Sequence, residues 1–335
     1  MVDFSTAAVP GNFLANFFPA LKYLPRWMPG AGFLKKAEEW GKNQYDATWI
    51  PYKWTEEHMA TGETYLPSLV GSVLHETGGN LPPGEKHSLV WSTGAVLGGG
   101  LDTVRYKLFE NISTRANYCL PQNMATILNF FYAMILHPDI QRKAQAEIDA
   151  LLRNQRLPTL TDRSSLPYIR ALVTEVYRWR TAGPLGRAYH RPIFLDSILI
   201  VIYLGVPHSL NKDDVYNGHM LHDPNIYPDP MTFNPERYKG LDTEMKKVTD
   251  LAFGFGRRAC PGYHFAQGTI YSIVMTTLAT CDILPPLAAD GKEYIPETEY
   301  SSGTISLPSR FDVRIKSRSL RAQELLNDVL SKERM

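Results

Sequence analysis

The chain is poor in cysteine, almost neutral and free of long apolar runs. Only three of its 335 residues are cysteines (Cys119, Cys260 and Cys281), which excludes a disulfide framework and fits a reducing compartment. Lysine plus arginine number 35 and aspartate plus glutamate 34, so the formal net charge is +1. Because phosphate binding needs a basic excess, this balance argues against nucleic acid as the main partner. The apolar run at 193–206 includes an aspartate and is too short to span a bilayer.

The N-terminal region is apolar but does not have the pattern of a signal peptide. Residues 1–30 contain no basic segment followed by a long apolar run, so we predict neither a signal peptide nor a spanning helix there. Prolines at 19, 25 and 29 interrupt the apolar and aromatic residues. We interpret the region as a loop packed on a core, and peripheral contact with a membrane surface is the alternative.

Helical periodicity prevails along the rest of the chain, and it predicts a mainly α fold with a small sheet. The expected helices cover 32–59, 65–75, 85–103, 124–136, 139–148, 168–180 and 262–281. Residues 184–234 have loop and strand character, and 311–315 is a strand candidate. No internal repeat is present, and the length alone would allow about two domains.

The most informative stretch is 253–262, which reads Phe-Gly-Phe-Gly-Arg-Arg-Ala-Cys-Pro-Gly. Cys260 precedes an apolar helix, whose free N–H groups favour a thiolate, and Arg257 and Arg258 add positive charge. The glycines permit tight turns and let the backbone approach a flat ligand. A lone thiolate suits a nucleophile or a metal ligand, and the spacing is not that of a zinc site. The alternative is a turn before a buried helix, with a cysteine that is merely small and apolar.

This stretch matches Phe-x-x-Gly-x-Arg-x-Cys-x-Gly at every fixed position, and the chain therefore resembles the cytochrome P450 family, in particular its fungal members. The resemblance implies the mainly α cytochrome P450 fold with small β-sheets, in a single domain over 1–335, and haem b (iron protoporphyrin IX) as cofactor. It implies that Cys260 is the axial thiolate on the iron, whose electron donation favours O–O cleavage. It also implies that Arg258 pairs with a haem propionate and that Phe253 shields the sulfur. Gly256 and Gly262 are the fixed glycines of the loop.

Two further motifs support the resemblance. Glu175 and Arg178 match the family's Glu-x-x-Arg, whose i, i+3 spacing places both side chains on one helix face. Arg237 belongs to a Pro-Glu-Arg motif, with Tyr238 in the place of the family's aromatic residue. By resemblance, the glutamate and the two arginines form a structural network and are not catalysts. Taken alone, the Glu–Arg spacing is also typical of a solvated surface ion pair.

Three glycines at 98–100 precede Asp102 and Thr103 and resemble the family's oxygen-activation segment. Each glycine costs a helix about 1 kcal/mol relative to alanine, so the helix can open locally there. The resemblance implies that Asp102 and Thr103 relay protons during catalysis. The alternative is a helix C-terminus with glycine as the stop signal. By the same resemblance, His208 reaches a haem propionate.

Two other features have ordinary structural interpretations. His219 and His222 are spaced i, i+3 beside Asp223, which is the pattern of a metal-binding pair. We favour an ordinary stretch of the family ahead of its Pro-Glu-Arg motif. Cys281 ends an apolar helix, and we expect it to be buried and inert.

The chain departs from the family pattern in three places. Only the C-terminal part of the pattern is present, so we expect the N-terminal part of the family fold to be missing. Residues 104–122 and 187–204 separate segments that the family joins directly. Val104 and Gln122 fit intron boundaries, because Val codons begin with GT and one Gln codon ends in AG. We interpret both segments as translated introns, and a folded insertion is the alternative for the first.

The resemblance implies a monooxygenase of fungal secondary metabolism that inserts one oxygen atom from O2 into an apolar small-molecule substrate. An NADPH-dependent reductase would supply the electrons, and Lys246 and Lys247, with Arg257 and Arg258, could form its docking face. The alternative is a catalytically inactive truncated fragment with weak or no haem binding. A reactive-cysteine hydrolase lacks a matching base. Fungal members usually reside at the endoplasmic reticulum membrane, and without an anchor we expect the chain to be cytoplasmic.

Overall fold

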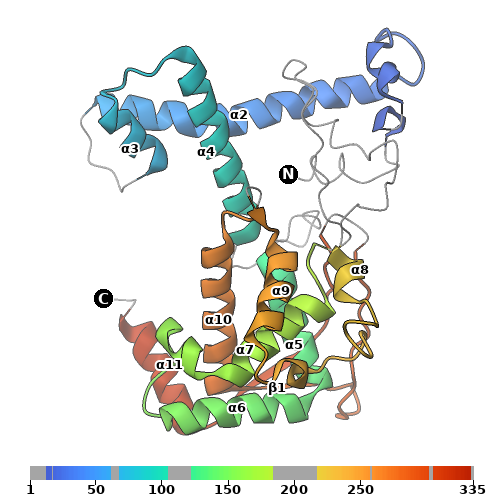
Figure 1. Cartoon of the computed structure of the whole chain (residues 1–335), viewed down its shortest axis with the longest axis vertical. Coiled ribbons are helices and arrows are strands. Elements are labelled where there is room, and N and C mark those ends of the chain that lie inside the picture. Colours follow the sequence, from blue (N-terminus) through green and yellow to red (C-terminus); the bar gives the residue numbers. More distant parts are fainter. Residues whose placement is uncertain are drawn as a thin grey trace. The chain divides into compact units, whose positions relative to one another are not determined.

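The computed structural model describes most of the chain as two compact units (Figure 1). Of the described residues, those up to 104 belong to the first unit and those from 122 onward belong to the second. The described residues are 13–16, 18–61, 68–104, 122–183, 217–256, 259–301 and 305–332. None of the helices among them combines the length and the hydropathy that crossing a bilayer requires.

The first unit is helical. Its elements are η1 (Leu14–Asn16), η2 (Pro19–Tyr23), α2 (Gly32–Ala60), α3 (Leu69–Glu76) and α4 (Pro83–Val104). Helices α2, α3 and α4 pack around a small core of Tyr52, Leu74 and Val90. The helices predicted at 32–59 and 85–103 are confirmed, and α3 covers the later part of the one predicted at 65–75. Ser68 begins α3 by accepting a hydrogen bond from the Gly71 amide at 2.9 Å.

Helices α2 and α4 approach closely where Gly94 faces Thr48. A Cβ added to Gly94 would lie 2.4 Å from Cγ2 of Thr48, which is itself buried. We expect Gly94→Ala to lower the stability of the first unit, because the overpacking cost of about 1–3 kcal/mol exceeds the helix gain of up to about 1 kcal/mol. Thermal unfolding followed by circular dichroism measures the change.

Gly41→Ala is the matched control for this prediction. Gly41 lies inside α2, and an added Cβ there meets no atom within 4 Å. We expect this variant to be stabilised by up to about 1 kcal/mol. Equal stabilisation of the two variants would contradict the close approach of the helices.

The second unit is a helical bundle with one small sheet. Its α-helices are α5 (Gln122–Leu136), α6 (Pro138–Leu152), α7 (Pro167–Trp179), α8 (Asn217–Leu221), α9 (Asp242–Phe253), α10 (Tyr263–Thr280) and α11 (Leu320–Lys332). Two 3-10 helices, η3 (Leu160–Ser165) and η4 (Pro235–Tyr238), join them. Strands β1 (Cys281–Leu284) and β2 (Arg314–Ser317) pair antiparallel, with Cys281 opposite Ser317 and Leu284 opposite Arg314.

Helix α7 lies at the centre of this unit and packs against α5, α6, α9 and α10 (Figure 1). Every residue from Ala171 to Trp179 is buried, and most belong to the main hydrophobic core. Glu147 of α6 defines where the helix begins, because its carboxylate accepts the amides of Tyr168 at 2.8 Å and Ile169 at 2.9 Å. These amides are among those that a helix start leaves without intrahelical partners.

Several expectations from the sequence need correction. The stretch predicted as loop and strand contains the short helix α8, and the strand candidate at 311–315 is displaced to 314–317. Cys281 is not a buried helix end, because it opens β1 and is only partly buried. Helices α9 and α11 were not predicted. Most of 104–122 and 187–204 lies outside the described residues, so their interpretation as translated introns remains a prediction.

Candidate functional site

A glycine-rich loop connects α9 to α10 and carries Cys260. Gly254 and Gly256 adopt φ angles of 79° and 66°, a left-handed region that glycine enters without steric cost. The loop closes where the Cys260 amide donates to the Phe253 carbonyl at 2.8 Å. The glycines predicted to turn the loop therefore do so, and the turn brings the cysteine back beside the end of α9.

Cys260 lies at the N-terminal end of α10 as a free, partly buried thiol. Its carbonyl accepts the Tyr263 amide at 3.3 Å, in the first turn of the helix. A Cβ added to Gly262 would lie 3.8 Å from the sulfur, an ordinary van der Waals distance, so Gly262 lies directly beside the thiol. The free amides and the dipole of a helix start support negative charge at such a position.

The ring of Phe253 is fixed between two tyrosines. It packs edge-to-face on Tyr177 of α7, with centroids 5.3 Å apart, and on Tyr263 of α10, with centroids 5.1 Å apart. The structure thus brings together four residues predicted for the site: Phe253, Gly256, Cys260 and Gly262. The contribution of Tyr177 was not predicted, although it lies inside the Glu-x-x-Arg motif.

Other residues predicted for the site are not tested in this way. Arg257, Arg258 and His208 lie outside the described residues. Asp102 and Thr103 belong to the last turn of α4, in the first unit. The three glycines at 98–100 lie inside this helix and do not end it, since it continues to Val104.

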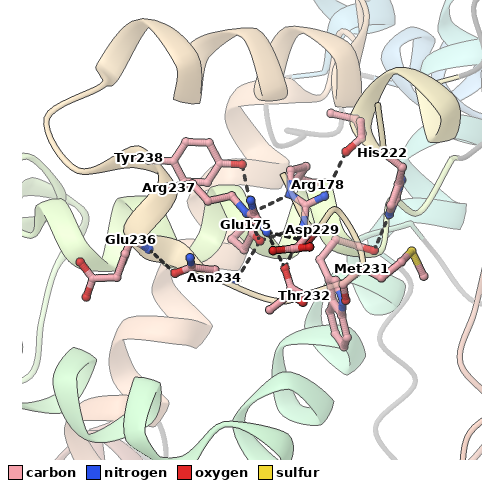
Figure 2. Close-up of polar contacts among 12 residues, drawn as sticks. Glu175, Arg178, His222, Asp229, Met231, Thr232, Asn234, Glu236, Arg237 and Tyr238 are labelled. Carbon is pink, nitrogen blue, oxygen red and sulfur yellow. Dashed lines mark hydrogen bonds and ion pairs between the residues drawn. The ribbon is translucent and has the colours of Figure 1, made fainter. Parts of the chain in front are cut away.

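A buried ionic network joins α7 to η4 (Figure 2). The side chains of Glu175 and Arg178 are both 0% exposed, and two hydrogen bonds of 2.8 Å pair the guanidinium with the carboxylate. Arg237 adds a contact from its Nε to Glu175 Oε1 at 3.1 Å. The predicted network of one glutamate and two arginines is therefore present, and the alternative of a solvated surface pair is wrong.

Backbone carbonyls accept hydrogen bonds from the other guanidinium nitrogens of the two arginines. Arg178 Nη1 donates to the Leu221 carbonyl at 3.0 Å, and Arg237 donates to the carbonyls of Pro228, Asp229 and Thr232. Buried charges are tolerated only when they are paired and hydrogen-bonded in this way. The network therefore ties the segment from α8 to η4 onto the central helix.

Two donors in this network were not predicted from the sequence. The backbone amide of Asn234 donates to Glu175 Oε1 at 2.9 Å, and the Tyr238 hydroxyl donates to Glu175 Oε2 at 3.1 Å. Burial, and secondarily the charge of Glu175, raises the pKa of Tyr238 well above its usual value, so the hydroxyl stays protonated. The only sequence signal was that Tyr238 occupies the aromatic position of the Pro-Glu-Arg motif.

The histidines near α8 have a structural arrangement. His222 directs Nδ1 to the Gly218 carbonyl at 2.7 Å and Nε2 to the Trp179 carbonyl at 3.1 Å, so both ring nitrogens face backbone acceptors. Within the part of the chain that the structure describes, no three His, Cys, Asp or Glu side chains are grouped to hold a metal ion. His222 thus contacts one backbone carbonyl of α8 and one of α7.

The lysines predicted to form a docking face are locally neutralised. Lys246 pairs with Asp250 and Lys247 pairs with Glu244, both on the exposed surface of α9. This arrangement is that of ordinary solvated charge, and it gives no net basic surface on the described part of α9.

Comparison with protein families and curated proteins identifies relatives of the chain. The model of the Cytochrome P450 family matches residues 124–312, which is more than half of the chain. Cytochrome P450 monooxygenase 105 of Postia placenta is 47% identical over 340 residues, covering 97% of this chain and 58% of that protein. Cytochrome P450 monooxygenase claR of Ampulloclitocybe clavipes is 34% identical, covering 97% and 56%. The chain thus spans a little over half the length of these curated relatives.

Solved structures show the same fold. A zebra fish cytochrome P450 with abiraterone aligns with a TM-score of 0.55 and 20% identity, covering 94% of this chain and 71% of that one. A zebra fish cytochrome P450 with progesterone gives a TM-score of 0.54 at 20% identity, covering 82% and 57%. Together with the family match and the mainly helical fold with a small antiparallel sheet, these similarities show that the chain belongs to the cytochrome P450 family.

Proposed function

We propose that the chain binds haem b through the Cys260 thiolate and belongs to a monooxygenase. The complete enzyme would insert one oxygen atom from O2 into an apolar small molecule, with electrons from an NADPH-dependent reductase. The observation that carries the proposal is the presentation of Cys260: a partly buried free thiol at the start of α10, held by the loop hydrogen bond to Phe253. The relatives, which are named as monooxygenases, support the reaction class.

The ligand atoms that the described residues offer suit a metal ion that is already held in a macrocycle. Cys260 offers one soft sulfur ligand, and the described residues provide no group of further ligands that could complete a metal site. When bound, haem would need only the Cys260 sulfur as its protein ligand here, and the thiolate would supply electron donation for oxygen activation. The residues present therefore fit the cofactor that the family implies.

Each neighbouring residue has a distinct task in this proposal. Gly256 and Gly262 leave room for a flat ligand beside the sulfur. Phe253, held by Tyr177 and Tyr263, covers the loop and limits the access of water to the thiolate. Arg258 and His208 are each assigned to a haem propionate. Asp102 carries a carboxyl and Thr103 a hydroxyl, and both are assigned to proton delivery.

The direct test is the uptake of haem by the purified chain. We expect titration with haemin to give a complex whose reduced, carbon monoxide-treated spectrum shows the Soret band typical of thiolate ligation. A chain that takes up no haem would contradict the proposal and favour the alternative, an inactive fragment. A complex with a spectrum typical of a neutral axial ligand would show that haem binds without the Cys260 thiolate.

A further inference from the structure

The Glu175 carboxylate is the centre of the buried network, and its two oxygens are not equally supplied with donors. Oε1 accepts hydrogen bonds from Arg178 Nη2, the backbone amide of Asn234 and Arg237 Nε. Oε2 accepts from Arg178 Nε and from the Tyr238 hydroxyl. Figure 2 shows the tyrosine reaching the carboxylate from the side of η4. Without this hydroxyl, Oε2 would keep one hydrogen bond from the described residues.

Tyr238 also lies just before helix α9, which leads to the loop that carries Cys260. It is 2% exposed and ends η4, and its carbonyl accepts the Leu241 amide at 2.9 Å immediately before α9. Helix α9 then ends at Phe253, whose carbonyl holds the Cys260 amide. The tyrosine therefore couples the fixed centre of the network to the helix that leads into the loop.

We propose that Tyr238 is a positioning residue for Cys260, and that its hydroxyl, more than its ring, fixes the start of α9 and with it the loop. The role rests on the proposed function, because the loop matters for haem ligation. A hydrogen bond from a neutral donor to a charged carboxylate is stronger than a hydrogen bond between two neutral groups. A phenylalanine would fill the same space and leave the carboxylate with four of its five donors.

The structure offers a matched control in Tyr168 of α7. It is partly buried, its hydroxyl oxygen is buried without a hydrogen-bond partner among the described residues, and its side chain has no place in the site around Cys260. Tyr168→Phe therefore removes the same group without removing a hydrogen bond. Tyr238→Phe removes a donor to a carboxylate.

The first measurement uses the haem-free chain with Cys119 and Cys281 replaced by serine, and follows the labelling of Cys260 by a soluble thiol reagent without denaturant. We expect Tyr238→Phe to change the labelling rate by about tenfold and Tyr168→Phe to leave it unchanged. A merely structural role would shift the unfolding midpoint but not the reactivity of the thiol in the folded state. Equal rates in Tyr238→Phe and the parent chain would overturn the proposal.

The second measurement uses the haem complex. We expect haem to leave the Tyr238→Phe variant about tenfold faster than the wild type, with a larger fraction in the non-thiolate form after reduction and carbon monoxide treatment. Equal rates of haem release from Tyr238→Phe and Tyr168→Phe would overturn the link to haem ligation. Failure of the wild type to bind haem would contradict the proposed function, whereas thiol labelling would still decide the role of Tyr238.

Discussion

The replacement Cys260→Ser is expected to abolish the thiolate-type spectrum of the haem complex completely. Serine is close to cysteine in size and keeps the backbone amide that donates to Phe253, so the loop can retain its conformation. Its hydroxyl is neutral at ordinary pH and does not donate electron density as a thiolate does. The comparison is made by reduced, carbon monoxide-treated absorption spectra of the two proteins at equal haem content.

Cys281→Ser is the matched control for this replacement. Cys281 is also a free, partly buried thiol, but it opens β1, and its sulfur lies 3.5 Å from the Thr280 hydroxyl. We expect its spectrum to equal that of the wild type. Retention of the thiolate-type band in Cys260→Ser would assign the ligand to another side chain. Loss of the band in both variants would point instead to a general loss of folding.

The cysteine loop could be predicted because its determinants are local. The glycines that turn it and the cysteine that it presents lie within ten consecutive residues, and their roles follow from backbone geometry and the adjoining helix. Helix α7 could be predicted from its periodicity, and the Glu-x-x-Arg spacing follows from the helix itself. In both cases the residues that interact are close in the sequence.

What the sequence did not reveal depends on contacts between distant residues. Strand β1 forms where Gln141 of α6 holds the amide and the carbonyl of Ile283, which are 142 residues away in the sequence. The donation from Tyr238 to Glu175 spans 63 residues. Periodicity and motif spacing report local preferences, so they cannot show which distant backbone groups a side chain will satisfy.

The second large effect is expected at the centre of the ionic network. Glu175→Gln keeps the shape of the side chain but removes its charge, which leaves the fully buried Arg178 without a counter-ion. Breaking a buried ion pair by removing one partner costs about 3–5 kcal/mol, a large part of the roughly 5–15 kcal/mol that stabilises a typical domain. We expect a corresponding loss in the free energy of unfolding, measured by denaturant titration followed by circular dichroism.

Glu236, which belongs to the Pro-Glu-Arg motif, provides the control for this replacement. Its carboxylate pairs with Lys143 at the surface, and 43% of the Glu236 side chain is exposed. Exposed pairs contribute about 0–1 kcal/mol, so Glu236→Gln should be close to neutral. If the loss in Glu175→Gln comes from the uncompensated cation, then Arg178→Met in the same chain should recover part of it, since the charge left unpaired is removed. Equal stability of Glu175→Gln and Glu236→Gln would mean that the buried network contributes no more to the free energy of unfolding than the exposed ion pair does.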